Sequence, residues 1–442
     1  MVVAGGLHRN CRPVYCMVVC AGATNAGKQG VRGVSEALSQ FAYDPLLALL
    51  FLALALGGAR ALLLLFGKLG GRFADVVGPS SQKLASLQGL RGVLAFSVVA
   101  HHACCWYFYS QSGVWWTGRS VLFDNLADFG VIQFFYLSGF LFWRKLIKRG
   151  RVPAGNFYLS RFIRIGPVYY VAVSAAIGLG LAFSGFQLQV PAWSLMTSLL
   201  PWLLFSIGGR PEVNHADILR ITCGVTWTLA LEWLFYLSLP FLAWFARRAW
   251  RLVVYAAAFG ALFLLSRHLR GAMAAPTGLC AAASMAAEYA KFMLIGFGGG
   301  MLVAATEGTL RERLRSLDRS RNWIVLACYV AYLVIPGIAG LGQVLLLVAF
   351  ALLVQGADLF GILVRPSTLL LGAISYPAYL VHGIVFYAAM RLRGGMQAVP
   401  AGSYMAETAA CLAAILLVAT AMHLFVERPT MALSERIARP EH

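Results

Sequence analysis

Charged residues are scarce in this sequence of 442 residues, where they make up 12 % of the chain. A soluble globular protein carries about a quarter charged residues and about half apolar ones, whereas here 60 % of the residues are hydrophobic. This shortage excludes a soluble globular protein. The apolar runs extend over about 20 residues, as membrane-spanning helices require, while barrel strands would show about 10 residues of alternating polarity. The sequence therefore predicts an all-α polytopic membrane protein.

Acidic residues are scarcer still, because 17 Asp and Glu stand against 36 Lys and Arg, which gives a net charge of +19. In a soluble protein this excess would indicate nucleic acid as a partner. Here Lys and Arg collect on one side of the predicted spans, in the stretches 144–164, 247–251 and 311–321. We interpret the excess as the positive-inside signal, which places this side in the cytoplasm. We expect membrane lipids, and no nucleic acid, as partners of the chain.

Cysteine spacings typical of metal sites and a secretory signal are both missing. The nine cysteines are scattered, mostly within apolar runs, so we interpret them as small apolar residues and predict no metal site. Residues 1–43 are polar, glycine-rich and irregular, without the apolar core and cleavage site of a signal peptide. No internal repeat is evident, so the sequence gives no support to a transporter built from inverted halves.

Ten apolar segments predict a bundle of 10 transmembrane helices within residues 84–430, followed by a cytoplasmic tail over 431–442. Residues 44–83 form an extra hydrophobic segment and a linker, and the bundle has 11 helices if 44–66 also spans. The stretch 191–207 is short and contains proline, so we expect an interfacial or re-entrant piece there. The predicted spans lie near residues 92–110, 128–147, 165–185, 223–245, 251–267, 286–305, 323–338, 340–356, 368–390 and 407–426.

The segment LQGLRGVLAFSVVAHH, residues 87–102, places ionisable residues inside the first predicted span. Arg91 and His102 are 11 residues apart, about three helical turns, so they share one helix face about 16 Å apart. With Arg91 at the cytoplasmic edge, His102 lies near the centre of a hydrocarbon layer about 30 Å thick. An ionisable residue at that depth indicates function, and a polar side chain satisfied between helices is the alternative. His101 points about 80° away.

Three further segments place charge in or near the spans. Glu232 lies inside an apolar span, where it would orient a histidine, act as a base or form an interhelical ion pair. Arg161 and Arg164 lie on one face at the start of the third span. Such a pair clamps phosphates or anchors the helix, and the pair alone favours the anchor. His423 and Glu427, one turn apart in the last span, are interpreted as structural.

The segment LGAISYPAYLVHGIVFY, residues 371–387, carries polar side chains along one predicted helix. Ser375, Tyr379 and His382 recur at i, i+4 and i+7, so they form one polar stripe. Pro377 should kink this helix and release a backbone carbonyl. His382 is therefore a second titratable group within the membrane.

These segments, in this order, resemble the acyltransferase 3 family of membrane acyltransferases over about residues 84–430. Six motifs in order, within matching spans, make the resemblance specific. Gln88 and Trp233 depart from the family pattern, in which acidic residues are usual at both positions. The matching segments are LQGLRG with the histidine at 102, FFYLSGFLF (134–142), FYLSRFIRIGPVYY (157–170), TWTLALEWLFY (226–236), ISYPAYLVH (374–382) and VERP (426–429).

The resemblance implies an integral membrane acyltransferase of the bacterial inner membrane. Such an enzyme moves an acyl group, commonly acetyl, from cytoplasmic acetyl-CoA or another acyl-CoA to a hydroxyl of a saccharide or glycolipid. It implies His102 as base or acyl carrier, with Glu232 orienting or charge-balancing it. A transporter or channel for a polar or anionic solute, using the same buried residues as a relay, is the alternative. Coenzyme A contacts are expected from Arg91, Arg161 and Arg164, and substrate contacts from Ser138, Trp227, Tyr379 and His382.

Overall fold

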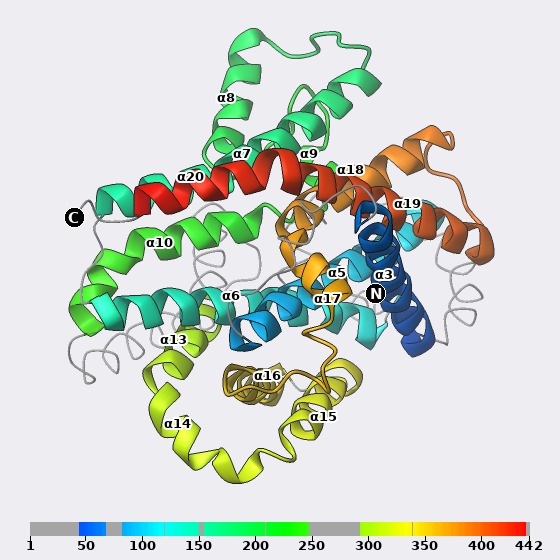
Figure 1. The fold of residues 1–442 in the computed structure, drawn as a ribbon. Helices are drawn as coiled ribbons and strands as arrows, with labels where there is room; N and C mark the ends of the chain where they lie inside the picture. The colour runs from blue at the N-terminus through cyan, green and yellow to red at the C-terminus, as the bar shows by residue number, and fades with distance from the viewer. Residues whose placement is uncertain are drawn as a thin grey trace, which may run out of the picture.

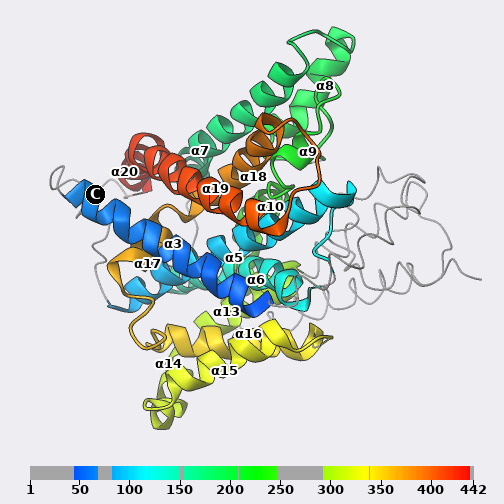
Figure 2. The ribbon, with the colours of Figure 1, turned by 90° about the vertical axis from the view of Figure 1, so that its right-hand side faces the viewer.

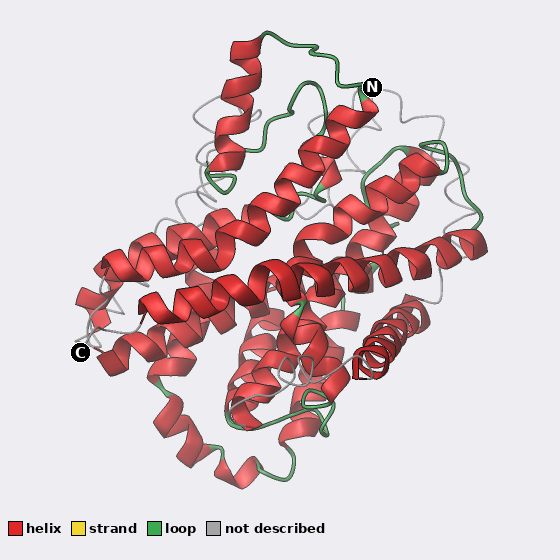
Figure 3. Cartoon of the chain, turned by 45° about the horizontal axis from the view of Figure 1, so that its top comes forward, coloured by secondary structure: helices red, strands yellow, loops and turns green. Residues whose placement is uncertain are grey.

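The computed structural model describes most of the chain and is helical throughout the residues that it describes. These are residues 44–67, 82–118, 120–149, 154–207, 209–246, 292–337 and 339–438. Figure 3 shows helices joined by loops. Within the described residues, strand pairing is limited to one isolated bridge between Val213 and Ala216. The all-α class is therefore confirmed. The predictions for residues 1–43, for the span 251–267 and for the tail after 438 lie outside the described residues.

Two long helices, α5 (Gln82–Ser112) and α6 (Val121–Arg149), run through the centre of the molecule. Figures 1 and 2 show them between two groups of helices, with α7, α10 and α18–α20 on one side and α13–α16 on the other. Helix α5 is buried along most of its length and is not among the helices apolar enough to count as a membrane span. Because other helices surround it in place of lipid, α5 tolerates Arg91, His101 and His102 in its interior.

The first group covers the side of the central pair where the chain's last helices lie. Helices α19, η5 and α20 continue one another, and α20 packs along α7. Helix α8, within the predicted interfacial piece 191–207, has only 12 residues and exposes Trp193 and Met196, so it does not span. The group consists of α7 (Ala154–Phe183), α8 (Ala192–Leu203), α9 (Ile218–Ile221), α10 (Trp227–Ala246), α18 (Ser375–Leu392), α19 (Ala401–Met422), η5 (His423–Glu427) and α20 (Arg428–Ala438).

The second group packs on the opposite side, chiefly against α6. The segment η3–α13 contacts α6 most closely, and the chain bends by 68° between α13 and α14. Helix α3 lies apart from this group, beside α17 and α19. The remaining elements are α3 (Asp44–Gly67), η3 (Phe292–Phe297), α13 (Gly298–Ala305), α14 (Glu307–Arg313), η4 (Arg315–Leu317), α15 (Arg321–Val334), α16 (Ala339–Val354) and α17 (Pro366–Ala373).

The described residues do not confirm the predicted count of ten membrane spans. By length and composition, four described helices can cross a membrane, or up to six if each bent pair is one span. One of the four is Leu47–Leu65 of α3. The additional N-terminal helix predicted at 44–66 is therefore long and apolar enough to cross a membrane. The predicted spans near 223–245, 323–338 and 340–356 are shorter apolar helices. The apolar segments of the sequence thus locate most of the helices. They do not show where a helix breaks, so they do not show whether it is long enough to span a membrane.

The kink predicted at Pro377 falls earlier in the chain. Helices α17 and α18 meet at Ile374 with a bend of 71°, and Pro377 lies in the first turn of α18. Proline has no N–H to donate to the carbonyl four residues before it, so the helix breaks at that carbonyl and restarts. The Ser375 hydroxyl donates a hydrogen bond of 2.8 Å to the Gly372 carbonyl and stabilises the break.

Glycines allow α6 and the η3–α13 segment to approach at backbone distance. A Cβ atom at Gly139 would lie 2.1 Å from the Phe297 carbonyl oxygen, and one at Gly300 would lie 1.9 Å from that of Tyr136. Neither distance leaves room for a methyl group. Gly139 and Gly300 therefore set the distance between these two helices.

We expect Gly300→Ala to destabilise the protein, because the added methyl group would force the two helices apart. Overpacking of this kind typically costs about 1–3 kcal/mol. Gly298→Ala is the matched control, since a Cβ there would meet its nearest neighbour at 3.6 Å. Thermal unfolding of the detergent-solubilised variants should give a lower midpoint for Gly300→Ala only. Equal midpoints would contradict the close packing.

Candidate active site

A cavity of about 360 Å³ lies between α5, α6, α7, α10 and α18. Phenylalanine, leucine and valine side chains form part of its wall, and polar side chains from six elements form the rest. Cationic side chains outnumber carboxylates by four to two, so the cavity attracts anions. The polar lining consists of Arg91, Ser138, Lys145, Arg161, Arg164, Thr228, Glu232, Tyr236, Ser375, Tyr376, Tyr379 and Glu427.

The predicted arginine pair lies in the cavity wall. Arg161 and Arg164 are one turn apart on α7, and both side chains line the cavity. The guanidinium of Arg161 lies over the ring of Phe142 at 5.4 Å and over that of Phe157 at 6.0 Å. Among the described residues, its buried Nε has no hydrogen-bond partner. The aromatic rings hold this cation in place, and its Nε remains available to an anionic ligand.

Glu232 and Glu427 supply the two carboxylates of the cavity wall. The Tyr236 hydroxyl, one turn along α10, donates a hydrogen bond to Glu232. Glu427 accepts a hydrogen bond of 2.7 Å from His423 Nδ1, so the predicted structural pair is present, but Glu427 also lines the cavity. Sequence reasoning missed Tyr236, although its position four residues after Glu232 is a signal for such a contact.

His102 and His382 form a buried pair beyond the cavity. The His102 Nδ1 and His382 Nε2 atoms are 3.0 Å apart, and neither residue is more than 1 % exposed. His382 Nδ1 lies 3.2 Å from the Ala378 carbonyl, which can only accept, so Nδ1 of His382 donates and its Nε2 accepts. His102 Nδ1 is then the donor, and the lone pair of a neutral His102 resides on Nε2. This arrangement fixes the His102 tautomer that can accept a proton.

The neighbouring histidine faces elsewhere. His101 Nδ1 lies 2.8 Å from the Phe123 carbonyl, and its Nε2 lies 3.5 Å from the Cys105 sulfur. Its ring stands at 76° to that of His102. The structure therefore separates the two adjacent histidines as the helical register predicted: His102 faces α18, and His101 faces the start of α6.

Tyr379 connects the cavity to the histidine pair. Its side chain lines the cavity, its hydroxyl lies 3.1 Å from the Thr228 hydroxyl, and its ring centroid lies 6.1 Å from that of His382. Ser138 is half-buried in the same wall. The cavity thus has arginines in its wall. Its lining residue Tyr379 also lies next to His382.

The structure places two of the predicted site residues away from the neighbours expected for them. Trp227 does not line the cavity, because its ring packs against Phe135 at 6.2 Å and Phe292 at 5.0 Å. Thr228 and Glu232 are one turn apart and face the cavity, so Trp227 points about 100° away from Thr228 and about 140° away from Glu232. Glu232 has the arginines and Tyr236 as neighbours, and not the histidine that it was expected to orient.

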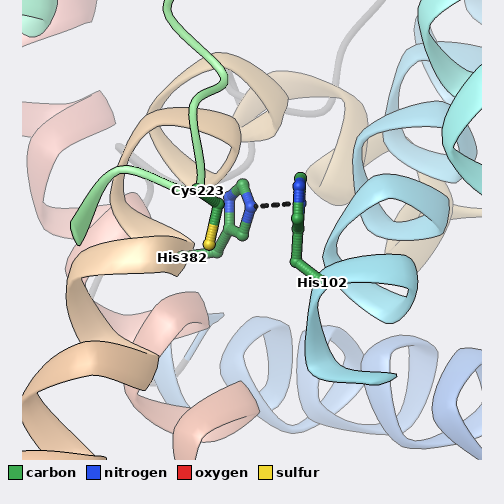
Figure 4. Close-up of side chains that lie close together, drawn as sticks. All are labelled: His102, Cys223 and His382. Carbon is green, nitrogen blue, oxygen red and sulfur yellow. Dashed lines mark hydrogen bonds between the residues drawn. The ribbon is translucent and has the colours of Figure 1, made fainter. Parts of the chain in front are cut away.

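Cys223 is a functional candidate that sequence reasoning missed. Its sulfur and one nitrogen from each of His102 and His382 all lie within 4.8 Å of one another, and all three residues are buried. Figure 4 shows the Cys223 side chain beside the His382 ring, which faces His102. The cysteine is 121 residues from His102 in the chain, so no local pattern could reveal this neighbourhood.

A family model described as an acyltransferase domain, of the acyltransferase 3 type, matches residues 84–424. The Acyltransferase MdmB of Streptomyces mycarofaciens is 28 % identical over 378 residues, which cover 81 % of this chain and 94 % of that protein. Nodulation protein 10 of Rhizobium leguminosarum bv. viciae is 28 % identical over 219 residues, which cover 43 % of this chain and 54 % of that protein. No solved structure matches the chain.

Proposed function

Because the chain belongs to the acyltransferase 3 family, we propose that it moves an acyl group from acyl-CoA to a hydroxyl group of a saccharide or glycolipid. The donor we propose is cytoplasmic acetyl-CoA, and the location is the bacterial inner membrane. The observation that carries the proposal is the cavity, which has three arginines in its wall and reaches Tyr379 beside the His102–His382 pair. Family membership favours this enzyme over the transporter alternative.

Arg91, Arg161 and Arg164 would bind the phosphates of coenzyme A. Guanidinium groups form charge-assisted, often bidentate, hydrogen bonds with phosphate oxygens. Arg91 and His102 are 11 residues apart on α5, a rise of about 16 Å along the helix. The long pantetheine arm of coenzyme A would extend along the cavity from the arginines and bring its thioester to the histidines.

His102 would act as the base that activates the attacking group. Its Nε2 accepts the proton of that group as the new bond to the thioester carbonyl forms. The same proton then passes to the sulfur of the departing coenzyme A, so His102 ends neutral. His382 would hold His102 in this tautomer through the Nδ1–Nε2 hydrogen bond, as an orienting partner does in catalytic triads.

Glu232 would balance charge within the arginine cluster. Without a bound anion, three guanidinium groups around one buried cavity repel one another, and Glu232 offsets part of this repulsion. Its hydrogen bond from Tyr236 holds the carboxylate in the wall. We therefore assign Glu232 a role in positioning the arginines and no role in proton transfer.

The function is tested by transfer of label from [14C]acetyl-CoA. Membranes that contain the overexpressed chain should transfer label to a saccharide or glycolipid fraction, and membranes with an empty vector should not. Mass spectrometry of surface glycans from cells with and without the gene would then identify the acylated hydroxyl. Uptake of a polar solute without consumption of acetyl-CoA would instead support the transporter.

We expect Tyr379→Phe to lower kcat, because the Tyr379 hydroxyl, whose hydrogen bond to the Val225 carbonyl is long at 3.5 Å, would instead donate to the oxygen that becomes negative in the tetrahedral intermediate. Loss of one such donor costs about 10²- to 10³-fold in kcat. Tyr376→Phe is the matched control, since Tyr376 lines the same cavity but its hydroxyl donates to the Ile165 carbonyl at 2.8 Å. Equal rates for the two variants would remove Tyr379 from the mechanism.

A further inference from the structure

We infer that Cys223 is a nucleophile that carries the acyl group between the two substrates as a protein thioester. This inference rests on the proposed acyl transfer and specifies its route. Cys223 is buried and free, and its sulfur lies within 4.8 Å of one ring nitrogen of each histidine of the pair. A thiol with a histidine base nearby is a common arrangement for covalent acyl transfer.

The backbone around Cys223 presents its thiol to the histidines. Cys223 has a φ of 52° and Gly224 a φ of 67°, so two successive residues adopt the left-handed region between α9 and α10. A non-glycine residue holds this conformation at a cost and keeps it only where the surrounding structure determines it. The Cys223 N–H donates to the Arg220 carbonyl at 3.0 Å, and the Gly224 N–H donates to the Leu219 carbonyl at 2.7 Å.

The neighbours of the sulfur leave space for it and hold it in place. Trp106 Nε1 donates a hydrogen bond to Cys223 Sγ at 3.2 Å, which holds the sulfur in this position. On α18, a Cβ atom at Gly383 would lie 2.8 Å from the same sulfur, so this glycine makes room for it next to His382. The thiol is therefore seated between α5 and α18, where Figure 4 shows the two histidines.

The relay proceeds in two balanced steps. In the first, the thiol proton passes to the histidine pair, the sulfur attacks the thioester carbonyl, and the bond to the coenzyme A sulfur breaks. Coenzyme A then leaves as a thiol with the proton from the histidines. In the second, the histidines take the proton of the acceptor hydroxyl, its oxygen attacks the Cys223 thioester, and the thiol regains a proton. No oxidant or reductant is needed.

The experiment is single-turnover labelling of the purified full-length protein with [14C]acetyl-CoA in the absence of acceptor. The wild type should become labelled, neutral hydroxylamine should release the label, and peptide mapping should place it on Cys223. Cys223→Ala should show no label above background and should lose transfer activity in membranes. Cys105→Ala is the matched control, because Cys105 is also buried beside a histidine, His101, but not beside the pair. It should label like the wild type.

The outcomes separate this inference from the proposed function. If Cys223→Ala transfers acetyl groups at the wild-type rate, or if the label maps to His102, the relay is wrong while the acyltransferase stands. The same conclusion follows if the purified protein contains a stoichiometric metal ion that Cys223→Ala loses, because the three residues would then be metal ligands. If the wild type neither becomes labelled nor transfers acetyl groups, both proposals fail.

Discussion

His102→Ala should lower the rate of acyl transfer by about 10²- to 10⁴-fold, the range that a general base typically contributes. Its Nε2 carries the lone pair in the tautomer fixed by His382. The rate is measured as label transferred from [14C]acetyl-CoA by purified protein reconstituted with acceptor membranes. The midpoint of thermal unfolding should match that of the wild type, so that the lower rate does not reflect a loss of folding.

His101→Ala is the control for this prediction, because it removes the adjacent imidazole from the same helix. His101 is engaged with the Phe123 carbonyl and the Cys105 sulfur, away from the pair, so its loss should change the rate by less than about tenfold. A His102→Ala variant with near-normal activity, together with an inactive His101→Ala variant, would show that the roles of the two histidines are reversed.

Arg161→Ala and Arg164→Ala should each weaken the binding of acyl-CoA. A hydrogen bond to a charged group contributes about 1.5–3 kcal/mol, which corresponds to roughly 10- to 100-fold in Kd. Because these residues would contact the phosphates and not the thioester, KM for acyl-CoA should rise while kcat at saturation changes little. Isothermal titration with coenzyme A and steady-state kinetics measure the two quantities.

Two variants distinguish phosphate binding from a general effect of charge. Lys148 lies exposed at the end of α6 and does not line the cavity, so Lys148→Ala should leave the affinity unchanged. Glu232→Gln removes a negative charge from the arginine cluster and should tighten binding with kcat largely retained. Raised salt should weaken binding by the wild type more than by Arg161→Ala. An unchanged Kd for coenzyme A in both arginine variants would show that the pair only anchors the helix at the cytoplasmic side of the membrane.

Local periodicity determined much of the site from the sequence. The spacing of 11 residues puts Arg91 and His102 on one face of α5 whatever surrounds the helix, because 3.6 residues per turn is a property of the backbone. The same rule placed Arg161 and Arg164 together on the face of α7 that lines the cavity. The shortage of charge likewise fixed the membrane class, since too few polar residues are present to cover a soluble surface.

Contacts between distant helices were decided by the tertiary structure alone. His382 is 280 residues from His102, and their hydrogen bond joins α18 to α5 after a bend of 71° between α17 and α18. Cys223 lies beside them because it belongs to a turn with left-handed backbone that packs against Gly383 of α18. Such contacts depend on helix crossing angles, helix breaks and the sizes of facing side chains. None of these produces a periodic pattern in the sequence.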